Sequence, residues 1–223
     1  MSKQSAIAEL VKEQGILPLF YNDDKNVSAD VVSALYNAGI KTVEYTNRGE
    51  QALSNFEYLV SLRQEKWPGL KLGIGTIKNA AAAKSFIEAG ADYIICPGFS
   101  AAIAETANAA DMPWVPGCMT PSEIMEAESL GAKLVKLFPG NILGPSYVSA
   151  VKEVFPRLFF MPTGGVEVSE DNIGAWFKSG VCAVGLGSKL VSKTLLEKKD
   201  YQTIETLTIE ALSIVKKVRA SMA

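Results

Sequence analysis

The chain has 223 residues, of which 48% are hydrophobic, and a formal net charge of −2 at pH 7. A sequence of this length without long polar tracts can bury one substantial core, which predicts a single domain over residues 1–223, and the small charge gives no reason to expect nucleic acid or a membrane as a partner. Because the sequence contains no histidine, it excludes Ser-His-Asp triads and Cys-His dyads and leaves proton transfer to carboxylates, lysine, tyrosine or water.

The N-terminal segment, residues 1–15, mixes charged and aliphatic residues and predicts an amphipathic helix rather than a secretory signal. No apolar run approaches the length needed to cross a membrane. The cysteines form neither an even set nor a CxxC pair, which indicates reduced thiols in a cytoplasmic protein. They are Cys96, Cys118 and Cys182.

Eight short apolar or β-rich runs follow this segment, with helix-like stretches between them. The runs are 15–20, 42–46, 70–75, 93–97, 114–119, 134–139, 159–163 and 182–185. Helix starts are expected at the capping residues Ser28, Asn79, Thr120 and Ser169. Eight β-then-α units predict an α/β protein closed into a (β/α)8 TIM barrel with an extra N-terminal helix. The alternative, a doubly wound open sheet, needs a glycine-rich loop after the first run, and residues 20–23 supply none.

One lysine stands in the middle of the sixth run. Strand alternation places Leu134, Lys136 and Phe138 on the same face. A lysine facing the helices would put a charge between two hydrophobic layers, so Lys136 is expected to face the barrel interior. Burial there disfavours the ammonium form and favours the free amine that Schiff-base chemistry requires. The alternative is a buried ion-pair lysine.

The second run repeats this pattern, because Thr42, Glu44, Thr46 and Arg48 share one face. The second and sixth strands of an eight-stranded barrel lie on opposite sides, so Glu44 and Lys136 can meet near the axis. Glu44 is therefore expected to be the acid-base partner of Lys136. A purely structural salt bridge is disfavoured because a hydrophobic pair would stabilise at least as well.

Polar residues at later strand ends suggest an anionic substrate. Arg48 could hold a carboxylate with two charge-assisted hydrogen bonds, and the Thr76 hydroxyl could join it. The segments 163–165 and 185–188 follow the seventh and eighth runs, where barrels commonly bind phosphate through backbone N–H groups. Each feature alone is more often a surface arginine, a cap or an ordinary turn.

Taken in order, these motifs resemble the KDPG/KHG aldolase family over about residues 16–190. The motifs are residues 44–48 (EYTNR), 73–76 (GIGT), 96–98 (CPG), 116–117 (PG), 136–139 (KLFP), 162–165 (PTGG) and 185–188 (GLGS). The resemblance implies a class I aldolase that acts on 2-keto-3-deoxy-6-phosphogluconate or 4-hydroxy-2-oxoglutarate. It also implies a TIM barrel, usually a homotrimer, which requires neither metal nor organic cofactor.

By position, the resemblance makes Lys136 the Schiff-base lysine and Glu44 the carboxylate that moves protons. Arg48 and Thr76 become the site for the pyruvate carboxylate. The phosphate residues become Thr163, Gly164, Gly165, Gly187 and Ser188, and the remaining pocket residues are Pro97 and Phe138.

The chain departs from the family in two places beside these motifs. Asn47 and Gly49 stand where the family commonly has Leu and Thr, and Cys118-Met119 replaces an Ile-Ser or similar pair. The departures leave open whether the substrate carries phosphate. The alternatives are an aldolase for an unphosphorylated keto acid, a phosphate-binding isomerase or decarboxylase that forms no adduct, and a silent sugar-acid-phosphate binding protein.

Overall fold

The computed structural model describes residues 2–222, so residues 1 and 223, the outer bounds of the predicted domain, lie outside the described part. The strands are β1 (Ile16–Phe20), β2 (Thr42–Thr46), β3 (Lys71–Gly75), β4 (Tyr93–Ile95), β5 (Trp114–Val115), β6 (Gly117–Cys118), β7 (Leu134–Leu137), β8 (Phe159–Pro162) and β9 (Val184–Leu186). The helices are α1 (Lys3–Gln14), α2 (Lys25–Asn37), α3 (Ala52–Lys66), α4 (Ala80–Glu88), α5 (Ala101–Ala109), α6 (Pro121–Ser129), α7 (Gly140–Val154), α8 (Glu170–Lys178), α9 (Lys193–Lys198) and α10 (Tyr201–Ala220). None of these helices is long and apolar enough to cross a membrane.

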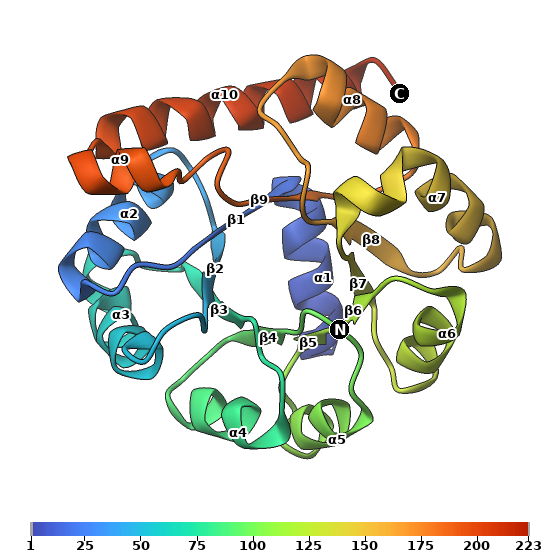
Figure 1. Ribbon diagram of the computed structural model, residues 1–223, viewed down its shortest axis with the longest axis horizontal. Coiled ribbons are helices and arrows are strands. Elements are labelled where there is room, and N and C mark those ends of the chain that lie inside the picture. The colour runs from blue at the N-terminus through green and yellow to red at the C-terminus, as the bar shows by residue number, and fades with distance from the viewer. Residues whose placement is uncertain (1, 223) are drawn as a thin grey trace.

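The fold is α/β, and its strands pair in parallel. One sheet has the order β5-β4-β3-β2-β1-β9 and the other has the order β6-β7-β8. Figure 1 shows the strands as a ring with the helices around it. A doubly wound sheet reverses its strand order in the middle. Within each sheet the strands pair with their neighbours in sequence, apart from the pairing of β9 with β1, which argues against that alternative.

The prediction of a single fifth strand over residues 114–119 is wrong, because Pro116 divides this segment into β5 and β6. Proline has no N–H to donate to a sheet ladder, so the strand is interrupted there. β5 pairs with β4, whereas β6 pairs with β7, and the two sheets therefore meet at Pro116. At the opposite edges a single bridge joins Thr163 to Gly185.

Two hydrophobic clusters follow from strand alternation. The larger lies between the strands and the surrounding helices and includes Val43, Val135 and Phe160. The smaller one gathers the inward side chains of the strands with apolar residues of α1. Its members include Leu17, Tyr93, Ile95, Val115, Leu134, Met161, Ile7, Ala8 and Val11.

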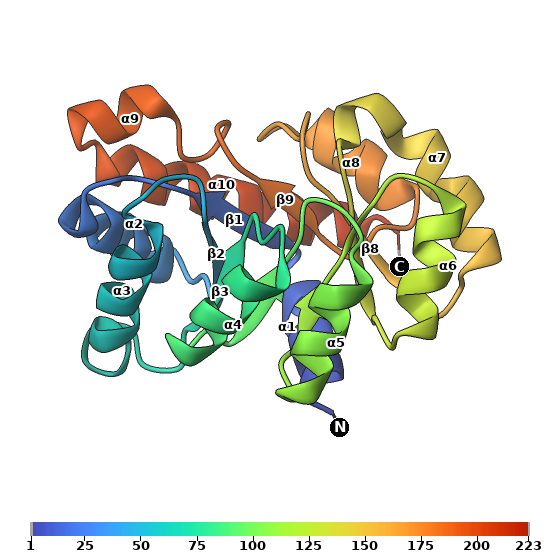
Figure 2. The same ribbon diagram turned by 60° about the horizontal axis from the view of Figure 1, so that its bottom comes forward.

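Helix α1 covers the N-terminal ends of the strands, as Figures 1 and 2 show from two directions. The Gln4 amide donates to the carbonyl of Trp114 at 2.7 Å and accepts from its N–H at 2.8 Å. The Gln14 side chain accepts from the Lys41 and Thr42 N–H groups and donates to the Ile16 carbonyl. With this end covered by α1, the C-terminal end of the ring is left to hold a site.

Three of the four expected helix caps are confirmed: Asn79, Thr120 and Ser169 each accept a backbone N–H at the start of a helix. The prediction for Ser28 is wrong, because α2 begins earlier and Asp24 caps it. Ser28 lies inside α2, where its hydroxyl donates to the carbonyls of Asn22 and Asp24. Aspartate is as good a cap as serine, and here it comes first in the chain.

The capping box of α6 generates a pH-dependent prediction. Burial alone would raise the pKa of Glu123, but hydrogen bonds from the Met119 N–H and from Thr120 outweigh it and lower the pKa below its ordinary value of 4.5. A lowered pKa stabilises the fold above the unfolded value, and that contribution is lost as pH falls through the folded value. Glu123→Gln keeps an acceptor but removes the charge, so it is expected to cost about 0.5 to 1 kcal/mol at pH 7.

Urea unfolding between pH 3 and pH 7 measures this difference, which should close as pH falls below 4.5. Glu126→Gln, an exposed change on the same helix, is the control and should follow the wild type at every pH. A constant gap between Glu123→Gln and wild type would contradict the electrostatic origin.

Candidate active site

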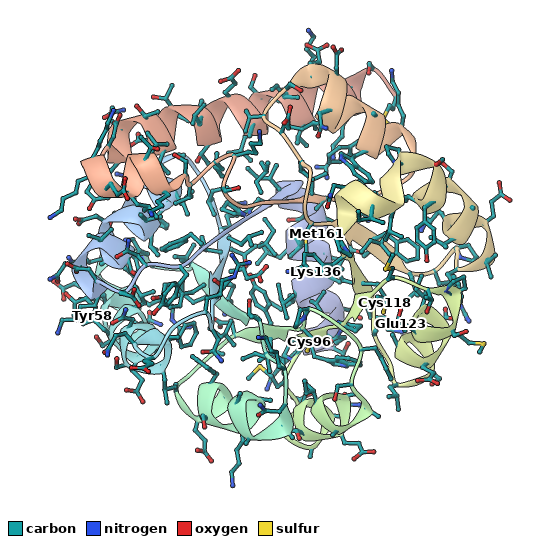
Figure 3. The ribbon with its side chains drawn as sticks, in the orientation of Figure 1. Tyr58, Cys96, Cys118, Glu123, Lys136 and Met161 are labelled. Carbon is teal, nitrogen blue, oxygen red and sulfur yellow. The ribbon has the colours of Figure 1, made fainter. Side chains whose placement is uncertain are left out.

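The site is centred on an ion pair that crosses the interior of the ring. Lys136 lies in the middle of β7 and Glu44 in the middle of β2, and Lys136 Nζ donates to Glu44 Oε1 at 3.4 Å. The lysine is 5% exposed and the glutamate 0%. Figure 3 shows Lys136 near the centre of the ring of strands. The structure thus brings together the two residues that strand alternation had placed on inward faces.

This ion pair is only partly satisfied. Glu44 Oε2 is buried and has no hydrogen-bond partner within residues 2–222. A buried charge normally has its lone pairs occupied, and unpaired polar atoms at depth are costly. A half-satisfied pair of this kind is a poor device for stability and is typical of a site that completes its hydrogen bonds with a substrate or water.

Two glycines make room for the pair. A Cβ on Gly75, in β3, would lie 1.8 Å from Glu44 Oε1, so only glycine lets the carboxylate keep its position. Gly117 is the register partner of Lys136 in β6. A Cβ on Gly117 would lie 2.4 Å from the carbonyl carbon of Pro97, which fixes Pro97 beside the strand that adjoins the lysine.

Cys96 shares the electrostatic environment of the pair. Burial raises the pKa of its thiol to about 12, while Lys136 lowers the value and Glu44 raises it. The thiol therefore stays protonated at neutral pH and is not a nucleophile. Among the residues described near the centre of the ring, Lys136 is therefore the candidate nucleophile.

Arg48 and Thr76 lie just past the C-terminal ends of neighbouring strands. The Asn47 N–H donates to the Gly75 carbonyl at 2.9 Å, which ties the end of β2 to that of β3. Thr76 has φ 61°, a left-handed conformation that a β-branched residue rarely adopts. Such strain concentrates at ligand sites, where surrounding structure over-determines the backbone.

A pocket of about 220 Å³ collects most of the remaining predicted residues at this end of the ring. It is lined by Arg48, Phe138, Thr163, Gly164, Gly165, Gly187 and Ser188, together with Leu19, Val166, Gly185 and Lys189. The Phe138 ring lies 5.7 Å from Lys136 Nζ and so connects this pocket to the ion pair. Thr76 and Pro97 are not among the residues that line it.

The glycine segment after β8 owes its shape to the start of α7. Gly164 and Gly165 have φ 96° and 73°, and a Cβ on Gly165 would lie 2.5 Å from Cβ of Asn141. The Gly140 N–H donates to the Thr163 carbonyl at 2.7 Å. Gly165 is thus required by the fold itself. The buried Thr163 hydroxyl has no hydrogen-bond partner in the described part of the chain.

The sequence interpretation missed several residues of the site. Lys189 lines the pocket and pairs with Glu167 at 3.0 Å, but a lysine after a glycine loop carries no distinctive signal. A second pocket of about 410 Å³ shares Leu19, Arg48, Gly187 and Ser188 with the first. Its other residues include Tyr21, Asn22 and Asp23. In the sequence, only one feature pointed to these three residues, and it did so indirectly. That feature is Gly49, which stands where the family commonly has Thr.

The family model for KDPG and KHG aldolases matches residues 7–207. The chain belongs to this family. It is 30% identical over 212 residues to the 2-dehydro-3-deoxy-phosphogluconate aldolase of Pseudomonas aeruginosa, covering 94% of this chain and 93% of the relative. It is 29% identical to the KHG/KDPG aldolase of Escherichia coli, covering 95% and 98% of the two chains.

A solved structure agrees with these relatives. The KDPG aldolase of Legionella pneumophila, with pyruvate captured at low pH as a covalent carbinolamine intermediate, superimposes with a TM-score of 0.82. The two proteins are 25% identical, and the match covers 90% of this chain and 95% of that one. Members of the family are class I aldolases, which makes the ion pair and its pocket the candidate catalytic centre.

The clearance at Gly75 can be tested directly. Gly75→Ala is expected to push the Glu44 carboxylate away from Lys136, since its Cβ would overlap Oε1. Turnover should fall about as far as in Glu44→Gln, roughly 10²-fold. Gly174→Ala is the control, because its Cβ would meet Val218 at an ordinary 3.7 Å. Steady-state aldol cleavage of both variants, with circular dichroism to verify folding, checks this, and an active, folded Gly75→Ala would refute it.

Proposed function

We propose that this aldolase reversibly cleaves a 2-keto-3-deoxy-6-phospho sugar acid, of the 2-dehydro-3-deoxy-6-phosphogluconate type, to pyruvate and glyceraldehyde 3-phosphate. The observation that carries the proposal is Lys136, buried mid-strand with its amine 3.4 Å from the Glu44 carboxylate. The covalent pyruvate adduct in the Legionella pneumophila relative supports the same chemistry here.

In the proposed reaction the amine of Lys136 attacks the C2 ketone, and loss of water gives an iminium ion. Glu44 removes the proton of the C4 hydroxyl, directly or through water, as the bond between C3 and C4 breaks. The electron pair of the broken C3–C4 bond moves into the iminium to give an enamine, and the aldehyde departs. Protonation at C3 and hydrolysis release pyruvate and restore the amine, so the chemistry itself requires neither metal nor organic cofactor.

Arg48 and Thr76 are proposed to hold the carboxylate of the keto acid. Arg48 lines the pocket that Phe138 connects to Lys136, and the strained backbone of Thr76 supports a binding role. The phosphate is assigned to a cup of hydroxyl and backbone groups that line the same pocket. The cup consists of Thr163, Gly164, Gly165, Gly187 and Ser188. Pro97 is assigned to the wall beside Gly117.

The second candidate substrate is 4-hydroxy-2-oxoglutarate or a related unphosphorylated keto acid. The name of the Escherichia coli relative includes both activities, which supports considering it. The alternative mechanism, a non-covalent isomerase or decarboxylase that forms no adduct, is disfavoured because the family consists of class I aldolases. The glycine cup favours a phosphorylated substrate, because backbone N–H groups at glycine turns are suited to oxyanions.

We propose that the whole chain is one (β/α)8-barrel domain preceded by an N-terminal helix, with its two sheets joined at Pro116 and at the bridge between Thr163 and Gly185. The three buried, unpaired cysteines favour a cytoplasmic location. A homotrimer is proposed from the family resemblance. Exposed apolar side chains on successive segments, Met119, Met125 and Ile142, support a contact surface between subunits.

Covalent trapping tests the central assignment. Incubation with pyruvate and borohydride should reduce the imine and attach the pyruvate carbons to Lys136, to be located by peptide mass spectrometry. Lys133 and Lys189 serve as internal controls, and Lys136→Met should abolish labelling. Labelling at another lysine, or no labelling of the wild type, would refute the Schiff base and favour the non-covalent alternative.

The phosphate cup is tested at Ser188, which is exposed and can be changed without disturbing the core. Ser188→Asp places a negative charge against the phosphate, so kcat/KM for the phosphorylated acid should fall roughly 10²-fold, because remote binding energy supports the reacting centre. Ser188→Asn is the neutral control of equal size and should lose less.

Two assays separate the phosphate from the pyruvate half of the site. Methyl proton exchange of pyruvate should persist in both Ser188 variants, since that half does not need the cup. If Ser188→Asp cleaves phosphorylated and unphosphorylated keto acids as well as the wild type does, the phosphate must be removed from the proposed substrate.

A further inference from the structure

The glycine beside Arg48 exists because a tyrosine fills its space. A Cβ on Gly49 would lie 2.1 Å from the hydroxyl oxygen of Tyr21 and 2.6 Å from its ring. No other residue at position 49 leaves Tyr21 where it is. The departure from the family at Gly49 is therefore coupled to Tyr21, which follows β1, and the two must be considered as one feature.

The loop that carries Tyr21 is held in place by the neighbouring elements. The carbonyl of Asn22 accepts from the Tyr45 hydroxyl at 2.8 Å and from the Asn55 amide at 3.1 Å. Asn55 also donates to the carbonyl of Asp23 at 2.8 Å. Asn55 is buried, so these bonds are shielded from water and fix the backbone on which Tyr21 stands. The tyrosine is thus preorganised.

The hydroxyl of Tyr21 has a defined hydrogen-bonding direction. It donates its only proton to Oδ1 of Asp23, and burial together with this bond raises the pKa of Tyr21, so the phenol stays protonated. The Gln51 N–H also approaches this oxygen, so with its proton used the hydroxyl has one remaining lone pair with which to accept a hydrogen bond from the pocket. Asp23 likewise offers only lone pairs. This wall can bind a donor, such as a hydroxyl group, and repels an anion.

The position of Tyr21 and Asp23 relative to the phosphate cup indicates which hydrogen-bond donor of the substrate this wall can bind. Tyr21 and Asp23 line the 410 Å³ pocket, which shares Arg48, Gly187 and Ser188 with the 220 Å³ pocket of the cup. In the aldehyde half of the proposed substrate, the carbonyl oxygen exchanges its proton with Glu44, while the carbonyl carbon bonds to the enamine held by Lys136, and the phosphate goes to the cup. One hydroxyl remains, on the carbon next to the aldehyde.

We propose that Tyr21, held by Asp23 and given space by Gly49, determines specificity by accepting a hydrogen bond from that hydroxyl of the aldehyde half. The inference rests on the proposed aldolase function. It extends that function by giving the chain a recognition element for a hydroxylated aldehyde, and it explains why glycine stands beside Arg48. The wall also directs the anionic end of the substrate away from Asp23 and toward the glycine loops.

The test is aldol synthesis from pyruvate with two acceptors, glyceraldehyde 3-phosphate and 3-oxopropyl phosphate, which differ only in this hydroxyl. Tyr21→Phe removes the acceptor oxygen and keeps the ring. It should lower kcat/KM for glyceraldehyde 3-phosphate about 5- to 10-fold and leave 3-oxopropyl phosphate unchanged, as expected for one hydrogen bond. Gly49→Ala, which displaces the tyrosine, should reproduce the selective loss.

Tyr58→Phe makes the same chemical change on α3, where the hydroxyl donates to Asn26 Oδ1 at 3.4 Å, and should alter the rate with neither acceptor. Equal losses of Tyr21→Phe on both acceptors, or no loss on either, would overturn the proposal. Pyruvate labelling of Lys136 is measured in each variant. If the wild type itself neither labels nor makes aldol product, the proposed function has failed rather than the role of Tyr21.

Discussion

The burial of one charged pair inside a parallel ring of strands is the constraint on which the rest of the structure depends. Lys136 and Glu44 lie at depth with a single hydrogen bond between them, and Glu44 Oε2 is left without a partner in the described chain. Such a pair costs stability unless its environment is shaped for it. The glycine at position 75 supplies that shape, because any side chain there would overlap the carboxylate.

One end of the ring of strands is closed by packing, and the other end holds the candidate site. At the N-terminal ends of the strands, α1 packs its apolar face on the inward side chains, while Gln4 and Gln14 satisfy the backbone groups where strands begin. This closes the core on the side away from the chemistry. At the opposite end, Arg48, Phe138 and the glycine loops line a pocket. The hydrophobic interior of the ring thereby supports a polar site at one end, while α1 shields it from water at the other.

The proposed phosphate cup is built from backbone more than from charged side chains. The segment 163–165 presents two glycines with positive φ against the start of α7, and the neighbouring loop 21–23 is tied down by Tyr45 and Asn55. Both loops are held by contacts that do not involve a ligand. Preorganised groups of this kind lose little entropy when the substrate binds, which is how a small pocket can discriminate between similar acids.

Strand alternation and loop composition were enough to predict the central features. The sequence determined that Lys136 and Glu44 face inward, that three helices start at Asn79, Thr120 and Ser169, and that glycines follow the last two strands, because each of these depends on local periodicity or on one residue's backbone preference. The break at Pro116 and the cap of α2 at Asp24 also follow from local preferences, although the sequence interpretation did not use them. Only the tertiary structure decided the coupling of Gly49 to Tyr21. Tyr21 and Gly49 belong to different strand ends, and their contact depends on how β1 and β2 pair and on where the loops then turn. That information lies in three-dimensional packing between distant segments, which no local pattern encodes.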